Sequence, residues 1–152
     1  MPDPVGLTPE ERRARVQRAV DLALAHFNAG FNCAESALYG VATALDLGAP
    51  EAVLRAATPF GGGIGLMGCT CGALSGAVMA LGLARGRLTP DAGQKKIAYR
   101  HAERLWRRFV ERAGGEDCRV INTLGFDHPD HRAFCGRFVA LGAELAAEEL
   151  LP

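Results

Sequence analysis

Residues 60–76 read FGGGIGLMGCTCGALSG, and an uncharged apolar run follows them as far as Ala84. These seventeen residues hold seven glycines and two cysteines. Glycine permits tight turns and a close approach of the backbone to another group. We therefore expect the stretch to turn sharply, to form the floor of a thiol-based site, and then to enter a helix lined with small side chains.

The uncharged segment from Ala56 to Ala84 raises the question of a transmembrane span. Pro59 and the glycine cluster interrupt its first half, and the helix that remains is too short to cross a bilayer. Glycine, serine and cysteine also dilute its apolar character. We interpret the second half as a buried central helix, and we predict no membrane partner.

Length and charge limit the protein class. The 152 residues predict one domain over 1–152, with residues 1–7 as a flexible N-terminus. Hydrophobic residues make up 49% and charged residues 22%, which is typical of a folded protein. The formal net charge is zero, so we expect no nucleic-acid partner. The N-terminus shows no basic segment followed by an apolar core, which favours a cytoplasmic location.

Cap residues and helical periodicity predict the secondary structure. Thr8-Pro9-Glu10-Glu11 is a capping box with proline at the first helical position, and Asn32 precedes a helix that begins at Cys33. We find no alternating strand pattern. The expected helices span 9–28, 33–47, 50–57, 70–84, 91–113 and 129–150, with a short turn that Asp117 caps. This pattern predicts an all-α, single-domain bundle of five to six helices around the small-residue central helix.

Three of the five cysteines lie at expected helix starts. Cys33 and Cys118 each follow a good cap residue, and Cys71 lies near the start of the central helix. Unpaired N–H groups there favour a negative charge, so we predict lowered thiol pKa values at these positions. Cys135 lies inside the last helix and joins the others only if its face points at the same pocket. Plain burial of cysteine as a small hydrophobe is the alternative.

Other motifs give weaker signals. His131 and Cys135 are four residues apart, so they share a helix face and could ligate zinc with other thiolates, although a solvated histidine is the simpler interpretation. Residues 63–68 match GxGxxG, but no strand precedes them, which argues against dinucleotide binding. The sequence contains no CxxC pair, and no nucleophile elbow or Cys-His-Asp order supports a hydrolase. We assign no catalytic residue.

Two sequence patterns are compatible with binding to another protein chain. Gly72, Gly76 and Ala80 form a ridge of small residues that allows close helix crossing, within the bundle or across a homodimer, and we favour packing within the chain. A solvated face explains the basic residues of the fifth helix, with an acidic partner as the alternative. These residues are Lys95, Lys96, Arg100, Arg104, Arg107, Arg108 and Arg112.

Taken together, Asn32-Cys33-Ala34, the glycine stretch, Cys71-Gly-Ala-Leu-Ser-Gly76, Cys118 and Cys135-x-x-Phe-Val139 resemble the C_GCAxxG_C_C family, which is described as redox-active. The resemblance runs from about Phe27 to Val139. It implies that Cys33, Cys71, Cys118 and Cys135 fill the four signature positions, whereas Cys69 is an addition. The family is also distantly similar to part of split-Soret cytochromes, for which an iron–sulfur centre has been suggested, but this chain lacks the haem-binding motif.

The resemblance leads to a first hypothesis and leaves two alternatives. The four signature cysteines would bind an iron–sulfur cluster or another soft metal ion, for electron transfer to an unknown redox partner or for sensing. The second hypothesis is thiol–disulfide chemistry, in which a low-pKa Cys33 or Cys71 attacks and another cysteine resolves. The third is a helical interaction module whose cysteines are merely packed.

Overall fold

The computed structural model describes residues 6–152, so most of the N-terminal stretch expected to be flexible lies outside the described residues. The described chain contains no β-strand, and the predicted all-α fold is confirmed. Short elements connect the long helices: α3 (Glu51–Ala56), η1 (Thr58–Phe60), α4 (Gly61–Ile64) and α7 (Cys118–Ile121). The long helices are α1 (Pro9–Asn28), α2 (Cys33–Ala44), α5 (Gly72–Arg85), α6 (Ala92–Ala113) and α8 (His131–Leu150).

The helix caps follow the sequence closely. The Thr8 hydroxyl accepts the Glu11 N–H at 3.1 Å, and the Glu11 carboxylate accepts the Thr8 N–H at 2.8 Å, so the capping box of α1 is confirmed. Asn32 caps α2 by accepting the Glu35 N–H at 3.0 Å. Helix α1 has the predicted bounds, and the capping box fixes its start by giving partners to the N–H groups of Thr8 and Glu11.

Two helix starts differ from the prediction by two residues. Helix α5 begins at Gly72 because Thr70 pairs with Asp117 in an isolated antiparallel bridge, which leaves Cys71 as the N-cap. Helix α8 begins at His131, since the chain from His128 turns first and the His131 N–H donates to the His128 carbonyl oxygen at 3.0 Å. Both differences come from contacts outside the helix concerned.

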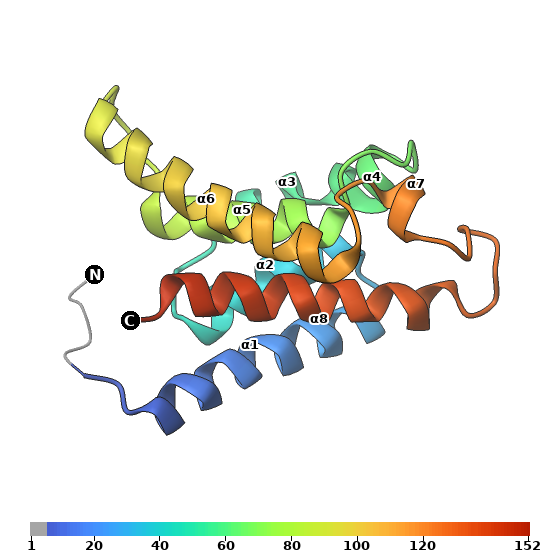
Figure 1. Ribbon diagram of the computed structural model, residues 1–152, viewed down its shortest axis with the longest axis horizontal. Helices are drawn as coiled ribbons and strands as arrows, with labels where there is room; N and C mark the ends of the chain where they lie inside the picture. Colours follow the sequence, from blue (N-terminus) through green and yellow to red (C-terminus); the bar gives the residue numbers. More distant parts are fainter. Residues whose placement is uncertain (1–5) are drawn as a thin grey trace.

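Three helices form the centre of the bundle. Helices α2, α5 and α8 contact one another, α1 covers α2 and α8, and α6 covers α5 and α8 (Figure 1). The largest fully buried side chains fill the space between them, namely Leu38, Leu74, Leu105, Phe109 and Leu145. No helix within residues 6–152 is long and apolar enough to span a membrane.

Glycines allow the central helices to meet backbone to backbone. A Cβ on Gly76 of α5 would overlap the carbonyl oxygen of Ala34 in α2, and a Cβ on Gly142 of α8 would lie 2.6 Å from the carbonyl oxygen of Ala73 in α5. The small-residue ridge therefore packs within the chain, as we favoured. Because Ala34 and Ala73 lie next to the starts of α2 and α5, this packing brings the two helix starts together.

Much of the basic side of α6 is paired within the chain. The guanidinium groups of α6 form ion pairs with carboxylates of α8: Arg104 with Glu149 at 2.5 Å, Arg108 with Glu148 at 2.5 Å and Arg112 with Glu144 at 3.2 Å. At these three positions the arginines therefore pair with carboxylates of α8 and not with solvent alone or with an acidic partner protein.

Candidate functional site

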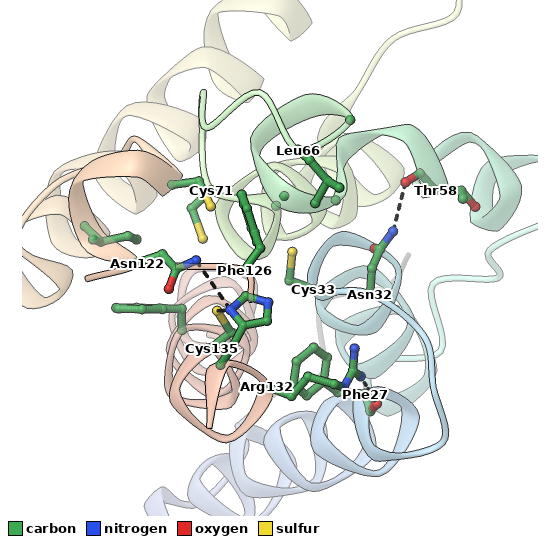
Figure 2. A pocket seen from close by; sticks show the side chains of 18 residues that line it. Phe27, Asn32, Cys33, Thr58, Leu66, Cys71, Asn122, Phe126, Arg132 and Cys135 are labelled. Carbon is green, nitrogen blue, oxygen red and sulfur yellow. Dashed lines mark hydrogen bonds between the residues drawn. The ribbon is translucent and has the colours of Figure 1, made fainter. Parts of the chain in front are cut away.

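One cavity of about 350 Å³ gathers the signature cysteines (Figure 2). Cys33 is the first residue of α2, Cys71 is the N-cap of α5, Cys118 is the first residue of α7, and Cys135 lies in the second turn of α8. All four line the cavity, so Cys135 does share a pocket with the others. Cys69 is not among the lining residues, and the cysteines are free thiols.

Two backbone hydrogen bonds bring α7 to the start of α5. The Cys71 N–H donates to the Glu116 carbonyl oxygen at 2.7 Å, and the Cys118 N–H donates to the Cys69 carbonyl oxygen at 2.6 Å. They flank the bridge between residues 70 and 117. This small antiparallel contact places Cys118 close to Cys71, although 46 residues lie between these two cysteines in the sequence.

Glycines make room for two of the thiol side chains. A Cβ on Gly72 would overlap the sulfur of Cys33, and a Cβ on Gly63 would lie 2.8 Å from the Cβ of Cys118. Gly63 also has a φ of +67°, a conformation that L-residues with a side chain rarely adopt. The sequence prediction that the glycine stretch lets the backbone approach a thiol site therefore matches the geometry at these two positions.

The glycine stretch is also tied to the start of α2. The Asn32 side-chain amide donates to the Thr58 carbonyl oxygen at 2.8 Å, while its oxygen caps α2. A Cβ on Gly61 would lie 2.6 Å from the same amide nitrogen. The cavity is lined by Asn32, Thr58 and Gly61. The Asn32 side chain therefore links the start of α2 to the segment around Thr58 on the cavity wall.

The thiol pKa values differ from the sequence prediction. Burial raises the pKa of Cys71 to about 12, with a further rise from Cys33, whereas the N–H groups of Ala73 and Leu74 lower it by less. Burial and then Cys33 also raise the pKa of Cys118. The prediction of lowered pKa values is therefore wrong for Cys71 and Cys118, because desolvation and neighbouring thiols outweigh the helix N-terminus.

The pKa of Cys135, in the last helix, is also raised. Burial, followed by Cys33 and Cys118, raises the pKa of Cys135 to about 11, and the charge of Arg132 opposes this rise. At neutral pH these buried groups are consequently neutral thiols. A bound cation is the kind of partner that would make them ionise together, since metal ligands bind as thiolates.

These shifts predict alkaline instability of the reduced, metal-free protein. As the pH rises above the ordinary thiol pKa of 9.0, the unfolded chain loses its thiol protons before the folded chain does. The free energy of unfolding should then fall between about pH 9 and pH 12, by on the order of a few kcal/mol for Cys71. Urea denaturation at about pH 8 and about pH 11 measures this fall. Cys71→Ser should lessen it, and an unchanged fall in that variant would contradict the assignment to Cys71.

Three polar side chains complete the cavity wall. The Sγ of Cys135 lies 3.5 Å from Nδ1 of His131, and the amide nitrogen of Asn122 lies 3.4 Å from the same atom. Asn122 is 8% exposed, and its Oδ1 has no hydrogen-bond partner among residues 6–152. Arg132 and Phe126 also line the cavity.

Sequence reasoning located only part of this wall. The spacing of four residues between His131 and Cys135 did signal their shared face, and His131 is partly exposed. His131 lies in the wall, and burial, followed by the charge of Arg132, lowers its pKa. Asn122 and Arg132 belong to no motif that could have signalled them.

The donor set suits a soft metal more than a hard one. The cavity lining holds four cysteines and one histidine but no aspartate or glutamate. Sulfur and imidazole ligands favour soft and borderline metals, including iron–sulfur clusters. Within residues 6–152, however, no three donors lie close enough together to hold a single ion.

The comparisons with known proteins agree with the cysteine pattern. The model of the family described as "Putative redox-active protein (C_GCAxxG_C_C)" matches residues 31–149. A protein of Archaeoglobus fulgidus, named only as an uncharacterized protein, is 28% identical over 151 residues, covering 93% of this chain and 96% of its own length. No solved structure matches the chain. Because the family model spans most of the sequence, the chain belongs to the C_GCAxxG_C_C family.

Proposed function

We propose that the four-cysteine pocket binds an iron–sulfur cluster, with which the protein transfers electrons or acts as a redox sensor. The observation that carries this proposal is the convergence of Cys33, Cys71, Cys118 and Cys135, from four different helices, on one cavity. Four cysteine thiolates are the usual ligand set of such clusters. When bound, the cluster would supply one-electron chemistry at a potential set by its surroundings.

A cluster suits the cavity better than a single ion does. Its four cysteine ligands are divided among two or more iron atoms, so the whole set spans more space than the four ligands of one zinc ion. The space of about 350 Å³ supports a polynuclear centre. Within residues 6–152 no three donors stand around one point, so a single ion has no ready site. A single soft ion remains the second form of the same proposal and would require the thiols to move inward.

The thiol pKa values support a cation-binding role over nucleophilic catalysis. A nucleophilic thiol needs a lowered pKa, whereas the pKa values of Cys71, Cys118 and Cys135 are raised by burial. A metal centre overcomes this cost by replacing the protons, which it must release on binding. The raised value at Cys71 counts directly against its use as the attacking group of a thiol–disulfide cycle.

The proposal also includes a partner. An electron carrier needs another protein or small molecule as donor and acceptor, so an unknown redox partner belongs to the proposed function. A cytoplasmic location and a homodimer remain predictions of the sequence. The metal-ligand roles of the four cysteines are likewise part of the proposal.

Anaerobic reconstitution with ferrous iron and sulfide tests this function. We expect the full chain to gain visible charge-transfer absorption that survives desalting. Single serine substitutions at Cys33, Cys71, Cys118 or Cys135 should each remove most of it, because each deletes one ligand. Cys69→Ser is the matched control and should retain the signal.

Two results would contradict the proposal. Protein that takes up no metal, but forms a disulfide between pocket cysteines on mild oxidation, would favour thiol–disulfide chemistry. If neither metal uptake nor disulfide formation occurs, and alkylation leaves the fold unchanged, the cysteines are packing groups.

A further inference from the structure

The cavity has a single permanently charged residue. Its lining holds Arg132 but no aspartate, glutamate or lysine. None of the ion pairs found within residues 6–152 includes Arg132. The positive charge of this guanidinium is therefore not neutralised by a carboxylate at 4.0 Å or less in the described part of the chain.

The guanidinium is held in place by neutral groups. Its Nη2 donates to the carbonyl oxygens of Phe27 at 2.5 Å and Phe31 at 3.0 Å, around the C-terminal end of α1. The Cζ atom of Arg132 lies 4.1 Å from the centroid of the Phe27 ring. Figure 2 shows Arg132 and Phe27 together on the wall that faces Cys33. These contacts fix the position of the charge, which the carbonyl dipoles at the end of α1 compensate only in part.

A four-thiolate centre in this cavity would need a positive counter-charge. Four thiolates carry four negative charges, and the oxidised core of a two-iron cluster carries two positive ones, so the centre is net negative. Each added electron makes it more negative. Arg132 is an exposed residue that also lines the cavity. Its positive charge favours the more negative state of a centre beside it, although water screens part of the effect.

We propose that Arg132 is the counter-charge of the four-cysteine centre, so that it strengthens cation binding by the thiolates and raises the reduction potential of the centre. The inference rests on the proposed function and adds a residue outside the four signature positions. Arg132 acts here as a positioning residue for charge and binds no metal itself.

The test compares three variants of the full chain. Arg132→Gln removes the charge and can still donate to carbonyl oxygens, whereas Arg132→Lys keeps the charge but loses the planar fork. Arg137→Gln is the control, because Arg137 lies on the same helix, stacks on Phe134 at 4.5 Å and does not line the cavity. Circular dichroism checks that each variant is folded.

The first readout is the reduction potential of the reconstituted centre. For Arg132→Gln we expect the equilibrium constant for reduction to fall about threefold to tenfold. A tenfold fall is about 59 mV for one electron. Arg132→Lys should keep most of the potential, and Arg137→Gln should leave it unchanged. An equal loss in the Gln and Lys variants would show a structural role and overturn the inference.

The second readout does not need a cluster. Titration of the metal-free protein with Co²⁺ follows thiolate-to-cobalt absorption, and its affinity should fall at least about threefold in Arg132→Gln but not in Arg137→Gln. If the wild-type protein forms no cluster yet binds Co²⁺, the cluster proposal fails and this titration still decides the role of Arg132. If the wild-type protein binds neither, both proposals fall.

Discussion

Gly76→Ala is expected to lower the free energy of unfolding by about 1–3 kcal/mol, because the new methyl group has no space. The position lies where α5 crosses α2, and an added Cβ would overlap the carbonyl oxygen of Ala34. A backbone atom cannot turn aside as a flexible side chain can, so the two central helices must move apart. Urea denaturation of the purified variant measures the loss.

Gly82→Ala provides the matched control in the same helix. Apart from the neighbouring residues and nearby backbone of its own helix, no heavy atom of residues 6–152 lies within 4 Å of the position that its Cβ would take, and the residue is exposed. Alanine should therefore stabilise the helix by up to about 1 kcal/mol, as it does in an exposed helix interior. A fall in the free energy of unfolding for Gly76→Ala together with a rise for Gly82→Ala would support the close crossing of α5 and α2. A neutral or stabilising Gly76→Ala would contradict it.

Gly72→Ala is expected to remove most of the metal-binding capacity while the protein stays folded. Its Cβ would overlap the sulfur of Cys33 and lie 3.0 Å from the Phe60 carbonyl oxygen. The sulfur is the mobile end of a side chain, so it should turn out of the pocket before the helices separate. Cobalt or iron–sulfur titration should then resemble that of Cys33→Ser.

Gly82→Ala also serves as the control for metal binding, because it changes α5 far from the pocket. Wild-type affinity in Gly82→Ala together with a large loss in Gly72→Ala would place the effect at the pocket. Unchanged binding in Gly72→Ala would mean that Cys33 is not held where its sulfur could act as a ligand.

Local signals predicted much of the fold. The capping box at Thr8 and the cap at Asn32 depend on neighbouring residues only, so the bounds of α1 and the start of α2 could be predicted correctly. The starts of α5 and α8 were less accurate, since a bridge from Thr70 to Asp117 and a turn at His128 shift them. Contacts of this kind join distant segments and leave no local pattern.

The site was harder to predict than the fold. The cysteine pattern selected four thiols that line one cavity, but a cap position alone suggested lowered pKa values for Cys71 and Cys118. Their raised values come from the depth of burial and from nearby Cys33, and both depend on how helices pack. Asn122 and Arg132 entered the site for the same reason, because only the packed structure brings α7 and the start of α8 to the cavity.

The most direct test of the central claim is the iron and acid-labile sulfide content of full-length protein purified without oxygen. The four-cysteine proposal predicts stoichiometric iron and sulfide, which Cys71→Ser loses and Cys69→Ser retains. Protein that contains neither iron nor sulfide, and that does not take them up on anaerobic reconstitution, would contradict it.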